Sequence, residues 1–313
     1  MAEDELTAPS DERARATRAA PEVPPVARGA RAGVVVHAAI AASVRGLVEQ
    51  ELRLRDGIDD EALHRARVAT RRLRSDLRTF ESLLDPDWTS RILEELRWLG
   101  GRLGGARDAD VLLAHIRAML DRVTVMHDDR DVLVAPLIAQ RQGSRRAVRE
   151  TLRNRRYGHL LDTLTEAATR PPLRGAAQSP AKKILPRLVD DRWRALRREV
   201  KRAGPAPRAE QLHKIRIRAK RTRYAAEAIS PAFGAPARRF ARRMEELQEL
   251  LGRHHDAVVA RAWLREVGPD ADPEVAFLAG EVAGLEAGEV TEVEHDWPEA
   301  WRTARRKRYR EWI

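Results

Sequence analysis

The sequence predicts an all-α fold with an internal duplication, made of two pseudo-symmetric helical-bundle halves. From about Gly33 onward, apolar residues recur with the 3.6-residue period of helices, and no convincing alternating β pattern occurs. In addition, a basic motif that begins Leu-His appears twice, at His64 and, 149 residues later, at His213. A repeat at this separation indicates that the same supersecondary unit is built twice.

The helical segments follow one another in order, separated by breaker residues. Residues 1–30 are polar and proline-bearing without a period, so we expect a disordered N-terminal tail. Residues 31–313 are then one domain, whose halves (31–170 and 180–313) meet at the Pro171-Pro172 to Pro180 break. The expected helices are 34–54, 60–84, 88–103, 108–126, 132–157 and 160–168, then 181–202, 209–229, 235–251, 256–267, 273–287 and 300–309.

Composition points to an anionic partner. The 313 residues carry 59 Lys+Arg and 48 Asp+Glu, a formal net charge of +11. Such a balance favours association with polyanions. The chain has no cysteine, which excludes disulfides and thiolate metal sites. We find no run of about 18 apolar residues and no signal-peptide core, so we expect a soluble, cytoplasmic protein without membrane contact.

Each copy of the motif forms a cationic stripe on one face of a helix. At about 100° per residue, five basic residues of the first copy lie within an arc of roughly 80°, and two more flank it, away from apolar residues such as Leu63, Leu73 and Leu77. The five are His64, Arg67, Arg71, Arg74 and Arg78, and the flanking pair are Arg65 and Arg72. We expect the binding residues to be His64, Arg65, Arg67, Arg71, Arg72, Arg74 and Arg78 in the first half, and His213, Lys214, Arg216, Lys220, Arg221 and Arg223 in the second.

Like charges at these spacings repel one another, and few acids are nearby. Each i,i+3 or i,i+4 pair of like charges costs a few tenths of a kcal/mol. Within the stripes we note only Asp76 and Glu227 as acids. A solvated or salt-bridged surface is the alternative explanation for one stripe, but two stripes in register favour a shared anionic ligand. The histidines either contact that ligand directly or orient the adjacent arginines.

A second element is repeated at a spacing of 148 residues. Leu-Gly at Gly104 is followed by Asp108, and Leu-Gly at Gly252 is followed by Asp256. Glycine suits a helix C-cap and aspartate a helix N-cap. We therefore expect a helix to end at each glycine and another to begin near each aspartate.

The two motifs together resemble the CHAD family, the conserved histidine α-helical domain. The resemblance covers about residues 33–305, and Arg223-Tyr224 fits the usual ending of the second motif. It implies two helical subdomains around a basic groove or pore that binds inorganic polyphosphate, with association with polyphosphate granules. The motif residues named above would then form the ligand surface. Many relatives carry a triphosphate-tunnel domain, but no Glu-x-Glu-x-Lys occurs here, so we expect no such chemistry.

Other classes of function remain as alternatives. An RNA- or DNA-binding protein would share the basic stripe, but aromatic stacking residues are scarce, at 4% of the chain. A phosphatase or phosphotransfer protein would use His64 or His213 as a nucleophile, but neither has a local general acid or a Gly-rich phosphate loop. We expect no enzyme activity and no cofactor. Because His254 and His255 diverge by about 100° on a helix, we expect no metal site.

Overall fold

Helices make up nearly all of the structure, a computed structural model that describes residues 18–56, 59–124 and 127–313. No β-strand forms within those ranges. They contain only isolated bridges, which pair Arg31 with Pro180 and Leu84 with Leu173. The prediction of an all-α fold is therefore confirmed. Below, "first half" means residues 31–170 and "second half" means residues 180–313.

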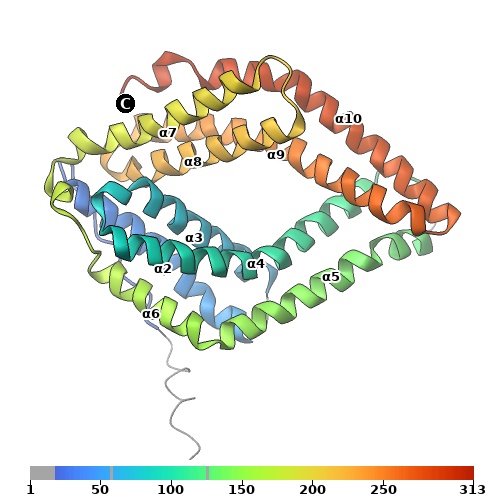
Figure 1. Ribbon diagram of the computed structural model, residues 1–313, viewed down its shortest axis with the longest axis horizontal. Helices are drawn as coiled ribbons and strands as arrows, with labels where there is room; N and C mark the ends of the chain where they lie inside the picture. Colours follow the sequence, from blue (N-terminus) through green and yellow to red (C-terminus); the bar gives the residue numbers. More distant parts are fainter. Residues whose placement is uncertain (1–17, 57–58, 125–126) are drawn as a thin grey trace, which may run out of the picture.

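The two halves occupy opposite sides of the molecule (Figure 1). The first half contains α2 (Ala32–Asp56), α3 (Asp60–Thr79), α4 (Pro86–Leu120), α5 (His127–Arg153) and α6 (Arg155–Thr169). The second half contains α7 (Ala181–Ala203), α8 (Ala209–Phe233), α9 (Ala235–Val267) and α10 (Pro273–Ala304). Short 3-10 turns lie at Glu81–Leu83, Gly175–Gln178, Gly268–Asp270 and Lys307–Tyr309.

Helices α3 and α8 carry the two cationic stripes. The carboxylate of Asp59 caps α3 by accepting a hydrogen bond from the Glu61 backbone N–H at 3.1 Å. Helix α8 ends at Gly234, whose φ of 66° lies in the left-handed region that favours glycine. Leu73 of α3 and Ile215 of α8 are fully buried, so the apolar face of each helix is in the core. The basic face of each helix consequently points away from that core.

The halves join through helix pairs that contain one member from each half. Helix α3 packs on α8, α4 on α9 and α5 on α10. In the described part of the chain, the buried apolar residues form a large core and a smaller one. The large core includes Trp193, whose ring lies 5.3 Å from that of Trp301. The smaller core joins α4 and α5 to α9 and α10 and includes Ile116 and Leu264.

The predicted helix boundaries at the two Leu-Gly elements are wrong. Helix α4 runs unbroken through Gly104 and Asp108, and α9 runs unbroken through Gly252. Neither glycine has a positive φ. A Cβ at Gly252 would lie 3.7 Å from Nε of Arg216, an ordinary van der Waals contact, so the space at this position does not require glycine. Helix α10 is likewise continuous, where the sequence suggested two helices.

The N-terminal segment contacts the fold where the structure describes it. Residues 1–17 of the predicted tail lie outside the described residues. Within residues 18–30, Arg18 pairs with Glu51 at 3.0 Å and with Asp162 at 2.8 Å. Val26 packs against the large core. The predicted disorder therefore does not apply to residues 18–30, because these contacts hold them against the first half.

Helix α2 is more apolar than the sequence analysis recognised. By length and composition alone, the stretch Ala32–Arg55 could cross a membrane, with a mean hydropathy of 1.4. However, 61% of its most apolar window is buried inside the fold, where Ile40 and Val44 belong to the large core. Burial of this kind is typical of a core helix, which meets the same criterion.

Candidate anion-binding groove

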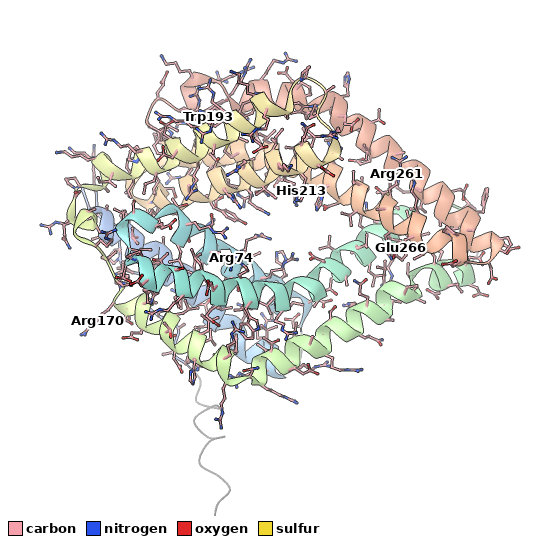
Figure 2. The ribbon with its side chains drawn as sticks, in the orientation of Figure 1. Arg74, Arg170, Trp193, His213, Arg261 and Glu266 are labelled. Carbon is pink, nitrogen blue, oxygen red and sulfur yellow. The ribbon has the colours of Figure 1, made fainter. Side chains whose placement is uncertain are left out.

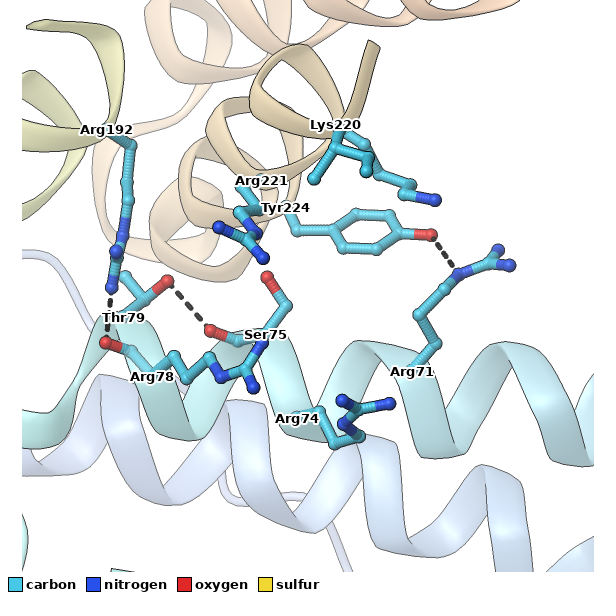
Figure 3. A pocket seen from close by; sticks show the side chains of 10 residues that line it. Arg71, Arg74, Ser75, Arg78, Thr79, Arg192, Lys220, Arg221 and Tyr224 are labelled. Atoms are coloured by element: carbon cyan, nitrogen blue, oxygen red, sulfur yellow. Dashed lines mark hydrogen bonds between the residues drawn. The ribbon is translucent and has the colours of Figure 1, made fainter. Parts of the chain in front are cut away.

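Two connected cavities lie between the halves. The narrow cavity, of about 240 Å³, is lined by Arg71, Arg74, Ser75, Arg78, Thr79, Arg192, Ile217, Lys220, Arg221 and Tyr224 (Figure 3). The wide cavity, of about 490 Å³, is lined by His64, Arg67, Val68, Arg71, Asp108, Val111, Leu112, His115, Arg216, Lys220, His255, Asp256 and Val259. Because Arg71 and Lys220 line both cavities, we treat the two as one groove.

The structure brings eight of the predicted binding residues to this groove. They are His64, Arg67, Arg71, Arg74 and Arg78 from α3, and Arg216, Lys220 and Arg221 from α8. Figure 2 labels Arg74 and His213 on the two helices that carry the stripes. Residues that are far apart in sequence thus share one surface, as the repeated motif suggested.

The other five predicted residues do not line either cavity. Arg65 pairs with Glu61 at 2.6 Å on the exposed side of α3. Lys214 is exposed on α8. His213 contacts His255 instead, and Arg72 and Arg223 form ion pairs. These side chains lie outside the groove, because each is on the helix surface beside the stripe or contacts a partner on another helix.

Glu227 holds Arg72 and Arg223 outside the groove through ion pairs. Its carboxylate pairs with Arg223 on the same helix, at 2.8 Å, and with Arg72 of α3. Arg223 also reaches Glu245 of α9, at 3.0 Å. These arginines are therefore neutralised locally, and the pair of Arg72 with Glu227 links the two halves.

Lys220 sits at the junction of the two cavities, among arginines. Burial lowers its pKa to about 7, and the positive charges of Arg71, Arg216 and Arg67 contribute to the shift. Lys220 forms no ion pair with any carboxylate of the described residues. The groove thus disfavours the charged form of this amine, which an anion placed there would stabilise.

Two arginines of the stripes have buried nitrogens without a partner. The Nε–H groups of Arg74 and Arg216 are buried and donate no hydrogen bond to any of the described residues. Burial lowers the pKa of Arg74, helped by Arg78 and Arg97. Burial also lowers that of Arg216, where Asp256 acts in the opposite direction. A buried donor left unpaired costs free energy, which a phosphate oxygen would recover.

Side chains from both halves hold the narrow cavity in shape. Nε of Arg71 donates to the hydroxyl of Tyr224 across the groove at 3.1 Å. Arg192 of α7 donates to the backbone carbonyl of Arg78 on α3 (Figure 3). The sequence analysis missed Arg192, which belongs to neither motif and gives no signal in the sequence. Tyr224 was noted only as the end of the second motif.

The histidines of the second half form a pair. Nδ1 of His213 and Nδ1 of His255 are 3.1 Å apart, so one ring donates to the other. Burial lowers the pKa of His255 to about 4, and His213 adds to this shift. His254 points elsewhere, toward Glu294 at 3.4 Å. Among the described residues, no three His, Asp or Glu side chains gather in a way that could hold a metal ion.

Carboxylates face the wide cavity, unlike the narrow one. Asp108 of α4 pairs with Arg67 at 2.7 Å. Burial raises the pKa of Asp256, although Arg216 opposes the shift. His115 bonds to the fully buried Glu286 at 2.7 Å, and this hydrogen bond raises the pKa of His115. The two aspartates that were expected to cap helices therefore lie at the groove.

Solved structures share this architecture. The chain is similar to the CHAD domain from the plant Ricinus communis, with a TM-score of 0.68 and 26% identity over 90% of this chain and 97% of that chain. PptA from Streptomyces chartreusis has a similar fold, with a TM-score of 0.73 and 23% identity over 87% of this chain and 100% of that chain.

Sequence comparison leads to the same family. Two uncharacterized proteins, from two strains of Mycobacterium tuberculosis, are each 33% identical to the chain over 239 residues. These residues amount to 73% of this chain and 44% of each relative, so the chain spans less than half the length of those proteins. The CHAD domain profile matches residues 38–265. With the groove between two helical halves and this match in hand, we conclude that the chain belongs to the CHAD domain family.

Proposed function

We propose that the groove binds inorganic polyphosphate without cleaving it. The observation that carries the proposal is the lining of the narrow cavity. Within the described residues, six cationic side chains line it and no carboxylate does. These side chains are half-buried, and a cluster of partly desolvated like charges is costly in free energy unless a counter-charge accompanies it.

The chemistry of the lining suits a chain of phosphates. Every repeat unit of polyphosphate offers anionic oxygens and no base or apolar group, so binding depends on paired cations and released counterions. The forked guanidinium of arginine can bond two oxygens at once, whereas lysine acts as a point charge. Five of the six cations in the narrow cavity are arginines, among the described residues. Both halves supply them, so one linear ligand would be held from two sides.

The two alternative nucleophiles lie in different places. His213 is outside both cavities, and its pKa is lowered by burial and by Arg216, whereas His64 lines the wide cavity. We assign the His213 and His255 pair to packing between α8 and α9. In the cell, the proposal places the protein in the cytoplasm, at polyphosphate granules, where it would bind or organise the polymer.

Calorimetric titration with long-chain polyphosphate tests the proposal, with release of phosphate followed over hours. We expect binding at low salt without turnover. Lys220→Gln should weaken binding at pH 6, where the amine is charged. The matched control is Lys214→Gln, which alters an exposed lysine of the same helix outside the cavities. Equal losses in the two variants, or steady phosphate release, would contradict the proposal.

Competition separates the main alternative ligand. RNA added at the same phosphate concentration should displace little long-chain polyphosphate, because the narrow cavity, where the cations gather, lacks an array of stacking aromatic side chains. Tyr224 is the aromatic residue of the narrow cavity within the described residues. Preferential binding of RNA would reassign the groove to nucleic acid.

A further inference from the structure

The two cavities of the groove differ in chemistry. The narrow cavity is cationic, as described above. The wide cavity has an aliphatic wall, formed by Val68 of α3, Val111 and Leu112 of α4 and Val259 of α9. Val259 remains 39% exposed there. Apolar side chains from three helices thus converge on one cavity that also contains carboxylates.

A bare phosphate chain gives these groups nothing to bind. Aliphatic side chains gain no favourable contact with anionic oxygens, and the carboxylates of Asp108 and Asp256 repel them. Sites for small organic ligands, in contrast, combine apolar walls with a few convergent polar groups. The wide cavity therefore has the lining of a site for a ligand with an organic part.

The polar groups of the wide cavity indicate which organic part it would be. Carboxylates accept hydrogen bonds, so Asp108 and Asp256 suit amino or hydroxyl donors. His64 and His115 also line the wide cavity, and histidine is among the side chains on which nucleobases stack. A base with an exocyclic amino group, attached to a ribose, provides all of these features.

The connection between the cavities indicates where the phosphates of such a ligand would lie. Arg71 and Lys220 border both cavities, so a group bound in the wide cavity can extend its phosphate chain past them into the narrow cavity. We propose that the groove accommodates a nucleoside polyphosphate, with the nucleoside in the wide cavity and the phosphates on the cations of the narrow cavity. This inference rests on the proposed binding of phosphate chains by the same groove.

ATP and inorganic tripolyphosphate are the discriminating probes. Both contain three linked phosphates, but the ribose ester of ATP replaces one ionisable oxygen. Electrostatics alone would therefore rank tripolyphosphate as the tighter ligand. We expect calorimetry without divalent cations to show ATP binding about tenfold more tightly, because its nucleoside buries apolar surface. Equal or weaker binding of ATP would overturn the inference.

A substitution in the aliphatic wall provides the second arm. Val259→Asn should weaken ATP binding about fivefold and leave tripolyphosphate binding within about twofold, because the side chain would contact only the nucleoside. The matched control is Val132→Asn, which changes a 54% exposed valine of α5 outside both cavities.

The outcomes separate this inference from the proposed function. Binding of tripolyphosphate and long-chain polyphosphate without preference for ATP would leave the proposed function standing and remove the nucleoside site. Failure of every phosphate ligand to bind would remove both. A Val259→Asn variant that weakens both probes equally would also contradict the inference, because it would assign Val259 to the packing of the groove.

Discussion

Arg71 and Tyr224, which are 153 positions apart in sequence, meet across the groove through a hydrogen bond of 3.1 Å from Nε to the phenol oxygen. The same ring lies 5.2 Å from the guanidinium carbon of Arg72 and 5.4 Å from that of Arg223. Tyr224 is thus a neutral side chain that orients arginines of both halves. A positively charged side chain at position 224 would instead repel these arginines.

The first prediction concerns this contact. Tyr224→Phe keeps the ring and removes the hydroxyl, so Arg71 loses its orienting bond but the packing remains. We expect polyphosphate affinity to fall about three- to tenfold, the effect of roughly 1 kcal/mol for one hydrogen bond. The melting temperature should change little. Titration calorimetry and a thermal melt measure the two quantities, and unchanged affinity would show that Arg71 needs no such support.

The second prediction tests cooperation between the halves. One double variant replaces Arg71 and Arg74 by Gln, and another replaces Arg216 and Lys220 by Gln. Each should weaken the binding of long-chain polyphosphate by about 100-fold or more, because both pairs hold the same ligand and neither half alone holds it tightly. A double-mutant cycle should then show strong coupling between the two sets. Additive losses would instead indicate two independent sites.

The third prediction concerns salt. If cations and released counterions dominate, log affinity for long-chain polyphosphate should fall linearly with log salt, by about 0.7 to 0.9 per phosphate contacted, by analogy with nucleic acids. Six contacts would give a slope of about −4 to −5. A flat response between low and physiological salt would contradict the electrostatic mechanism.

The fourth prediction follows from Lys220, whose pKa in the empty groove is about 7. Bound phosphate favours the charged amine and raises that pKa, so binding takes up a proton above pH 7. Affinity should therefore fall at least about tenfold from pH 7 to pH 9. Lys220→Arg stays charged and should flatten the profile. The internal phosphates remain ionised throughout, and His255, with a pKa of about 4, stays neutral.

The fifth prediction concerns the stability of the unliganded protein. Because the pKa of Lys220 is lower in the folded state, the unfolded state binds more protons between about pH 7 and its ordinary value of 10.5. Stability from this group therefore rises with pH across that window. Lys220→Met removes the penalty, so we expect a melting temperature about 2 °C higher at pH 6. The gain should shrink by pH 10. Lower stability at pH 6 would contradict this interpretation.

The sequence predicted the all-α fold and many of the residues that line the groove because helical periodicity places i, i+3 and i+7 residues on one face, whereas the family was indicated by the resemblance of the two repeated motifs. His64, Arg67 and Arg71 follow this rule. The periodicity could not show that Arg72 turns to Glu227, because that carboxylate comes from the other half. An ion pair between two distant helices depends on how the helices pack, and the residue pattern of a single helix does not contain this information.

The same limit explains the errors at the Leu-Gly elements. A glycine at a helix end and a glycine in the middle of a helix are identical in sequence. Gly104 and Gly252 are in the middle of a helix, because α4 and α9 continue through them. Arg192 was missed for a related reason, since its contact with Arg78 is made through a backbone carbonyl. Every residue has a backbone carbonyl, so a pattern of side chains in the sequence cannot indicate which carbonyl an arginine contacts.

The large core and the smaller core are each built from residues of both halves. Separating the halves would therefore expose apolar surface of both cores to water, which costs free energy. We therefore expect the groove to keep its width when a ligand binds. A ligand that is too wide for the groove, such as a nucleic-acid duplex, should then bind less well than a thin, single-stranded anion.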